Sequence, residues 1–347
     1  MKTYLNYILI FTATIILWSC DDVEPALVDY RITLSAGIND MNSSRSTNGV
    51  VFNGTSAHNM TATVLFSNVP GEFQKHDVDN LASSAPTYLP YHATVTYSDD
   101  TPVAIYPFND NQRVLSYPIS QENPVYCVGL YPASEGDGNS NRWIFSEDYK
   151  KAVHNIDGKK DIMFASQVSG TWATPIPKQT YRHLLSWLII EATVTDSEAF
   201  KSWGKIKRIS ITNPNNQVEI TLGDGTVEFS NNSNQENQID AFNKTNTESE
   251  WLDLGMTVNN IGSLLLAPAK EYEITVVTEK VTRTVIVPLL DNNGEKLIDN
   301  NYKEKTMGKL FLITLYFNSF VDIDASCSLV PWNEQNEELR PVKPETN

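Results

Sequence analysis

Short β-type segments dominate the pattern of apolar and polar positions along this chain. Runs rich in Val, Ile, Thr, Tyr and Phe recur about every ten residues between turn-forming residues, which is typical of β-sandwiches and barrels. We expect strands at 29–36, 62–67, 92–97, 103–106, 125–131, 184–194, 207–212, 217–222, 227–230, 263–267, 271–279, 282–290, 309–318 and 321–330. The sequence therefore predicts an all-β fold.

The last expected strand shows the alternation clearly. Every second residue of 321–329 is apolar, so one face of this strand should be buried and the other wet. Together with 309–318, it should form a closing hairpin.

Two short segments carry helix signals. Residues 146–153 predict two helical turns with Ser146 as N-cap, and residues 196–204 predict a helix that Asp196 caps and Gly204 ends. Helices should thus be few and short.

Two connections can be interpreted from their composition. Gly223-Asp224-Gly225 between two β-type runs predicts a hairpin. Residues 231–246 are rich in Asn and nearly free of apolar side chains, so we expect an exposed loop there.

A division into two domains is predicted near residue 175. Pro175 and Pro177 interrupt a stretch without apolar alternation. The expected parts are a signal peptide (1–19), an acidic tether (20–28), an N-terminal β-sandwich (29–174), a C-terminal β-sandwich (175–332) and a polar tail (333–347).

The N-terminus has the pattern of a secretory signal. Lys2 precedes an apolar run at 7–17, which is shorter than the about 20 residues that span a bilayer. Ser19-Cys20 at its end resembles a bacterial lipobox, in which the signal is cut before the cysteine and that residue is acylated. We predict that Cys20 is lipidated and anchors the chain in the outer membrane. The alternative is an ordinary cleaved signal in which Cys20 is incidental.

Acidic residues follow the predicted lipid site at once. Asp21, Asp22 and Glu24 resemble the export signal that sends such lipoproteins to the outer face of the cell. A charged flexible tether is the alternative interpretation. Surface display is the prediction.

Composition excludes some partners. The 347 residues include 42 acidic and 26 basic side chains, a net charge of −16, whereas binding a nucleic acid backbone needs a basic face. Besides Cys20, the chain has only Cys127 and Cys327, about 200 residues apart in strand-like contexts. Two buried free thiols are favoured over a disulfide framework, which would show more cysteines.

No sequence motif indicates an enzyme, a metal site or a cofactor. The nucleophile-elbow, zinc-protease and phosphate-loop motifs are missing from the sequence. His183 lies within an apolar strand, which favours a packed histidine over a catalytic one. Asp137 and Asp224 lie in Gly-Asp-Gly triplets, where turn formation is favoured over calcium binding.

Several landmarks follow one another along the chain. They are Ser44-Arg45-Ser46-Thr47, an aromatic strand at 125–132 ending in Tyr-Pro, Asp161-Ile-Met-Phe-Ala165, residues 181–188 around His183, and a closing Pro331-Trp332. In this order they resemble the fimbrillin-like (Mfa-like) family of Bacteroides-type bacteria, which are lipoprotein subunits of cell-surface fimbriae.

The resemblance implies a fold and a mode of assembly. The fold would be two tandem transthyretin-like β-sandwiches. A surface protease would cut after an arginine near the N-terminus, the first strand would leave its sheet, and a strand from another fimbrial subunit would take its place. The resemblance also implies adhesion, with a host or bacterial surface receptor as a further partner.

Arg45 best matches the processing site. It lies in the polar, Gly-containing stretch 42–49, which a protease can reach. Arg31 is less suited because it lies within the alternating segment 30–34. The alternative is that Arg45 is only a solvated loop residue.

The C-terminal tail is a poor donor strand. Residues 333–347 offer only Leu339 and Val342 as apolar anchors and contain two prolines. Either another segment is donated, or this chain is an anchor, tip or accessory subunit.

A monomeric surface glycan-binding lipoprotein is the rival interpretation. Trp143, Trp172, Trp203 and Trp251 lie near expected loops, where flat aromatic platforms for sugar rings would lie. Packing in a core is the alternative for each of them.

Overall fold

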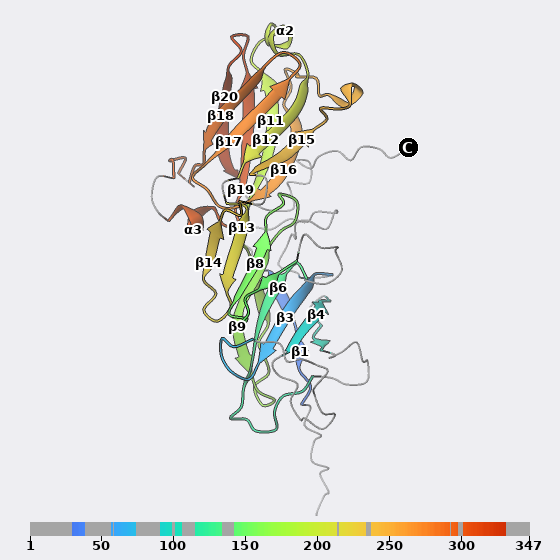
Figure 1. Cartoon of the computed structure of the whole chain (residues 1–347), viewed down its shortest axis with the longest axis vertical. Coiled ribbons are helices and arrows are strands. Elements are labelled where there is room, and N and C mark those ends of the chain that lie inside the picture. Colours follow the sequence, from blue (N-terminus) through green and yellow to red (C-terminus); the bar gives the residue numbers. More distant parts are fainter. Residues whose placement is uncertain are drawn as a thin grey trace, which may run out of the picture. The chain divides into compact units, whose positions relative to one another are not determined.

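Strands make up nearly all of the regular structure. The computed structural model describes residues 30–38, 57, 59–73, 91–98, 101–105, 115–133, 142–213, 215–233, 237–291, 293–297 and 301–330. Within these ranges, strands β1 to β20 form five sheets (Figure 1), so the all-β prediction is confirmed. No helix in the described ranges is long and apolar enough to cross a membrane.

The largest sheet has six strands and is apolar on both faces. Their order is β2 (Ala36–Ile38), β10 (Gln179–His183), β9 (Met163–Gly170), β6 (Val125–Tyr131), β3 (Thr61–Ser67) and β4 (Tyr91–Thr96). Because side chains alternate between the faces of a strand, Cys127 packs into one core and Val128 into another.

Two smaller sheets supply partners for these faces. On the first face, Leu34 from the pair β1 (Thr33–Leu34) and β5 (Val103–Ala104) shares a core with Cys127. On the second, a four-stranded sheet contributes Val218 and Ile220 to the core of Val128. That sheet has the order β14 (Val227–Ser230), β13 (Gln217–Thr221), β8 (Lys151–Asn155) and β7 (Ile144–Phe145).

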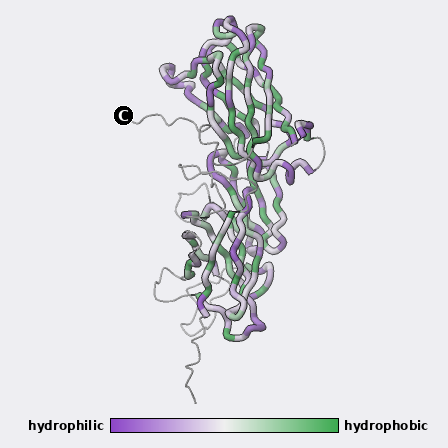
Figure 2. Tube along the Cα trace, turned by 180° about the vertical axis from the view of Figure 1, so that it is seen from behind, coloured by the Kyte–Doolittle hydropathy of each residue, from purple (hydrophilic) through white to green (hydrophobic). Residues whose placement is uncertain are grey.

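Two further four-stranded sheets enclose the third core. One has the order β16 (Asn259–Leu266), β11 (Ser186–Val194), β19 (Leu310–Phe317) and β20 (Ile323–Val330). The other has the order β15 (Gln238–Asn243), β12 (Ile206–Thr212), β17 (Glu271–Thr278) and β18 (Thr282–Pro288). Ile190 and Ile313 from the first sheet pack with Ile209 and Ile274 from the second, which makes this part a β-sandwich. Figure 2 shows apolar residues concentrated along its strands and polar residues in its turns.

Strand β20 shows the alternation expected from its sequence. Asp324, Ser326 and Ser328 are exposed, whereas Ile323 is buried and the residues between them are half-buried. Only β19 is its hydrogen-bonded neighbour in the sheet, so this strand is an edge.

The predicted boundary near residue 175 falls between two neighbouring strands. β9 before it and β10 after it pair antiparallel in the six-stranded sheet. Likewise β8 pairs with β13, which comes later in the chain. The division into domains 29–174 and 175–332 stays a prediction.

The helix expected at 196–204 is present as α2 (Ala199–Trp203). The Asp196 carboxylate accepts hydrogen bonds from the backbone N–H groups of Glu198 and Ala199, at 3.0 and 2.9 Å. Gly204 ends the helix with φ 71°, a conformation that glycine adopts without steric cost. Two further short elements, η3 (Glu248–Glu250) and α3 (Tyr302–Thr306), had no clear signal in the sequence.

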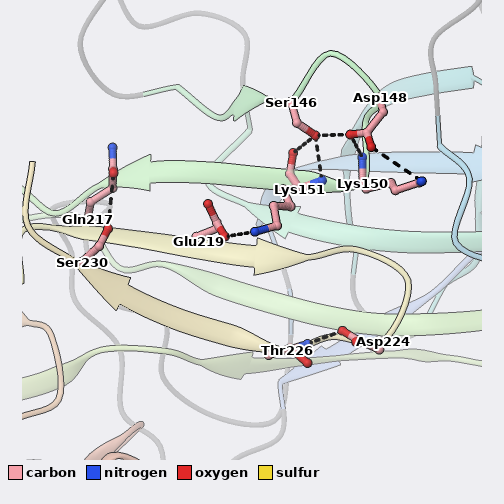
Figure 3. Close-up of polar contacts among 9 residues, drawn as sticks. All are labelled: Ser146, Asp148, Lys150, Lys151, Gln217, Glu219, Asp224, Thr226 and Ser230. Carbon is pink, nitrogen blue, oxygen red and sulfur yellow. Dashed lines mark hydrogen bonds and ion pairs between the residues drawn. The ribbon is translucent and has the colours of Figure 1, made fainter.

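The helix expected at 146–153 is wrong. Residues 146–150 form the turn of the β7–β8 hairpin (Figure 3). The Ser146 hydroxyl accepts a hydrogen bond from the Lys151 N–H at 3.0 Å and donates one to Asp148 at 2.7 Å. Serine and aspartate can close a turn as readily as cap a helix. Pairing of β8 with β13 decides between the two.

We expect Ser146→Ala to raise the pKa of Asp148 toward its ordinary value of 3.8. That pKa is lowered because the Ser146 hydroxyl and then the Lys150 N–H donate hydrogen bonds to the carboxylate. Since the folded pKa is the lower one, the bond stabilises the fold above pH 3.8 and is lost as the pH falls through the folded pKa. NMR titration of the carboxyl carbons measures this.

Asp224 is the control for that titration. Its pKa is lowered by the Thr226 N–H, which donates a bond of 2.9 Å, and Ser146→Ala should leave it unchanged. An Asp148 pKa that does not move would contradict the turn geometry.

The Gly-Asp-Gly hairpin is confirmed between β13 and β14. Asp224 accepts the Thr226 N–H (Figure 3) and Gly225 has φ 73°, so this aspartate serves the turn. Among the described residues, no group of three His, Cys, Asp or Glu side chains could hold a metal ion. Asp137 lies outside the described residues.

The exposed loop expected at 231–246 is partly wrong. Residues 238–243 form β15, which pairs antiparallel with β12. Ile239 and Phe242 are half-buried against the sandwich core. These isolated apolar residues do not make an alternating run, so only the neighbouring strand reveals their role.

Both cysteines in the described ranges are free. Cys127 is buried, and Cys327 on β20 is half-buried. Burial raises the pKa of both thiols, that of Cys327 to about 11. The prediction of free thiols is confirmed, and full burial holds for Cys127 alone.

Candidate functional site

The residues predicted to carry function lie outside the described residues. These are the lipid site Cys20, the export residues Asp21, Asp22 and Glu24, and the processing site Arg45. The same holds for the tail 333–347. Their roles stay predictions, and the site is therefore built from the described segment between Cys20 and Arg45, residues 31–38, which we call the N-terminal strand segment.

Backbone hydrogen bonds hold the first half of this segment. The Ile32 N–H donates to the Leu115 carbonyl at 2.7 Å, and the Ile32 carbonyl accepts the Ile105 N–H at 3.3 Å. β1 then pairs antiparallel with β5. Both backbone groups of Ile32 are thus hydrogen-bonded.

The second half joins a different sheet. The Gln179 N–H donates to the Ser35 carbonyl at 2.9 Å, and β2 then runs parallel to β10. β2 is the terminal strand of the six-stranded sheet. Its removal would leave β10 as the new edge, with unpaired backbone groups.

Alternate side chains of the segment enter the core. Ile32 and Leu34 are completely buried, and Ala36 and Ile38 are 6% and 3% exposed. They pack in one cluster with residues of the six-stranded sheet such as Val64. Because the segment supplies four alternate inward-facing side chains, its loss would open an apolar groove beside the sheet.

A buried polar cluster lies beside this strand. The Tyr97 hydroxyl donates to the Gln179 side-chain oxygen at 2.7 Å and lies 3.1 Å from the Tyr181 hydroxyl oxygen. Burial raises the pKa of both tyrosines, so they remain neutral. Sequence reasoning found Tyr181 through a motif but missed Gln179 and the parallel pairing of β2, for which no local pattern exists.

Tyr181 needs small residues beside it. Across the sheet, Tyr181 pairs with Ala165 on β9, and Ala165 pairs with Gly129 on β6. A Cβ on Gly129 would lie 2.1 Å from the Tyr181 hydroxyl oxygen. Gly129 therefore makes room for the ring that lines the groove.

We expect Gly129→Ala to destabilise the chain by about 1–3 kcal/mol, because overpacking forces the tyrosine or the backbone to move. Urea unfolding measures the change. Gly255→Ala is the control, since the nearest atom to its Cβ would lie 3.4 Å away, and it should change stability by less than about 0.5 kcal/mol. Equal effects at the two glycines would contradict the close approach.

Two sequence landmarks meet at a buried pair. His183 Nδ1 lies 2.5 Å from an Asp161 carboxylate oxygen, and the side chains are 3% and 0% exposed. His183 is in β10, and Asp161 lies just before β9, the adjacent strand. The expectation of a packed, hydrogen-bonded histidine is confirmed.

The tryptophans proposed as sugar platforms are instead packed within the protein and hydrogen-bonded to its backbone. Trp143 and Trp203 are 3% and 0% exposed. Trp172 and Trp251 are half-buried and donate their indole N–H groups to the carbonyls of Ile119 and Lys244. Lys207 Nζ also lies 4.2 Å from the Trp251 ring centroid. The indole N–H of each of the four tryptophans thus donates to a backbone carbonyl.

No protein-family model matches the sequence, and no curated protein does either. Solved structures are similar over most of the chain. A candidate cell adhesion protein from Bacteroides uniformis has 13% identity and a TM-score of 0.47, covering 87% of this chain and 98% of that one. A candidate polysaccharide-binding protein from Bacteroides thetaiotaomicron has 6% identity and a TM-score of 0.44, covering 87% and 98%.

A fimbrial protein from Bacteroides ovatus has 10% identity and a TM-score of 0.35, covering 84% of this chain and 50% of that one. The solved structures similar to this chain include candidate cell adhesion proteins, a candidate polysaccharide-binding protein and a fimbrial protein, all from Bacteroides.

Proposed function

We propose that this chain is a lipid-anchored subunit of a surface fimbria that assembles by strand exchange and supports adhesion. Cys20 carries the lipid, and a protease cuts after Arg45. The N-terminal strand segment then leaves, and a strand from another subunit fills the groove. The chain is non-enzymatic in this proposal.

One observation supports the proposal most directly. The described segment between the anchor and the cleavage residue forms two sheet-edge strands, β1 and β2, and its alternate residues Ile32, Leu34, Ala36 and Ile38 are buried. Such a strand can be exchanged for another one, because main-chain hydrogen bonds and alternate pockets do not depend on which chain supplies them. A segment that lay only on the surface would leave no buried groove for another strand to fill.

The glycan-binding alternative has less support. Its four candidate tryptophans are buried or half-buried with their indole N–H groups engaged. A fimbrial subunit is therefore the function that we propose.

N-terminal sequencing of the protein on intact cells tests the processing step. Wild type should yield a new N-terminus at Ser46 and heat-labile ladders in denaturing gels. Arg45→Ala should keep the anchored N-terminus and lose the ladders, whereas Arg31→Ala, the matched control, should behave as wild type. If wild-type cells carried only intact, lipidated chains, the strand-exchange step of the proposal would be contradicted.

A further inference from the structure

Three loops gather at one end of the six-stranded sheet. β3 ends beside the start of β6, where Ser67 pairs with Tyr126, and β9 ends there too, where Gly170 pairs with Val125. The connections 68–72, 118–124 and 171–178 therefore leave the sheet at the same end, which we call the loop end.

The loop end exposes apolar side chains. Ile119 is 78% exposed, Val69 is 40% exposed, and Trp172 is half-buried. The Trp172 indole N–H donates to the Ile119 carbonyl at 2.8 Å, which links two of the loops. In these three connections of a chain with net charge −16, only Glu72, Glu122 and Lys178 are charged.

The N-terminal strand segment also leaves the fold at this end. β2 runs parallel to β10, which starts at Gln179 after the third loop. Toward the N-terminus, the chain continues from β2 to Arg31, which pairs with Ser116 just before the connection 118–124. The Ile176 N–H of the third loop donates to the Tyr117 hydroxyl at 2.8 Å. The segment thus emerges among the loops.

Chain length then limits the distance to the predicted anchor. Positions 20 and 31 are eleven residues apart, and a chain of that length reaches at most about 40 Å. A bilayer that holds the acyl chains of Cys20 therefore lies within that distance of Arg31. Tethering at short range gives an effective concentration on the order of millimolar, so even a weak contact becomes populated.

We propose that the loop end rests on the phospholipid bilayer, with Ile119 and Val69 in the interface and Trp172 at headgroup level. Tryptophan favours that level, and aliphatic side chains gain from leaving water. The low charge of the loops matters because carboxylates would be repelled by an anionic surface. This contact rests on the proposed lipid anchor, and cleavage after Arg45 would end it by releasing the tether.

A vesicle experiment tests the contact without requiring native lipidation. Residues 21–347 contain the whole compact unit Arg31–Asn347. With an N-terminal hexahistidine tag, they are held on vesicles of phosphatidylethanolamine and phosphatidylglycerol that carry a nickel-chelating lipid. An NBD fluorophore is placed at Ile119→Cys in a Cys327→Ser background. The control carries the fluorophore at Phe320→Cys, because Phe320 is 90% exposed but lies on the β19–β20 turn of another sheet.

The fluorophore at position 119 should shift to the blue on binding. Lipids brominated on the upper acyl chain should quench it roughly twofold more than the one at position 320, because interfacial groups lie about 5–10 Å into the headgroup boundary. Val69→Ser should reduce the quenching at 119, with an unchanged thermal unfolding midpoint showing that the fold is intact.

Equal quenching at positions 119 and 320, or none at 119, would overturn the proposal. This result can be interpreted whether or not the proposed function is correct. Mass spectrometry of Cys20 and of the Ser46 terminus in cells tests the anchor and the processing, whereas the vesicle tether replaces the lipid.

Discussion

A chain that begins at Ser46 should unfold at a lower temperature than the intact chain and regain stability when a peptide of residues 29–40 is added. Trimming removes Ile32, Leu34 and Ile38 from a core in which each is at most 3% exposed. It also leaves the edge of β10 unpaired. At a peptide concentration of about 100 times its Kd, binding should restore about 2.7 kcal/mol. Thermal unfolding at several peptide concentrations measures this.

A peptide carrying Leu34→Asp is the matched control. It keeps the main-chain hydrogen bonds of the strand but would bury a carboxylate without a partner, so it should give little or no rescue. A trimmed chain that melts like the intact one and ignores both peptides would mean that the segment is dispensable. Strand exchange at this groove would then have no energetic basis.

Breaking the buried pair of Asp161 and His183 should be a costly side-chain change. Asp161→Ala and His183→Ala should each destabilise the chain by about 3–5 kcal/mol, because each leaves a buried polar partner without its hydrogen bond. The double variant should cost less than the sum by about 0.5–3 kcal/mol. Urea unfolding of the four proteins gives this coupling energy.

The exposed ion pair of Lys151 and Glu219 is the control cycle. Its nitrogen and oxygen lie 2.6 Å apart (Figure 3), but the side chains are 49% and 29% exposed. Solvent screening should make its coupling much weaker than that of the buried pair. If the buried pair couples no more strongly than this exposed one, then burial adds nothing to the contact between the two sequence landmarks.

Strands rich in β-branched and aromatic residues could be predicted from the sequence. β6 and β14 have the expected bounds, and β3 and β20 differ from them by one or two residues. In these segments the residue types favour an extended strand, so local pattern and tertiary structure agree. The α2 helix was predicted for the same reason, since Asp196 and Gly204 act on backbone groups nearby.

Segments that depend on a distant partner were misjudged. Residues 146–150 carry turn-forming side chains that also suit a helix start, and pairing of β8 with β13 decides between the two. The isolated apolar residues of β15 do not predict a strand by themselves, and only pairing with β12 makes this segment a strand. The Asp161–His183 contact joins residues 22 positions apart, and neither landmark by itself reveals the other.

The sequence by itself determined the β class of this protein, and it predicted a first strand at 29–36 from the local alternation of apolar residues. These follow from residue type and spacing, which act over a few neighbouring positions. Only the tertiary structure decided that this strand ends one sheet while pairing with β5 in another, and that three loops gather where it leaves the fold. Such features depend on which strands become neighbours, and that choice is made by burial and hydrogen bonding between segments far apart in the chain.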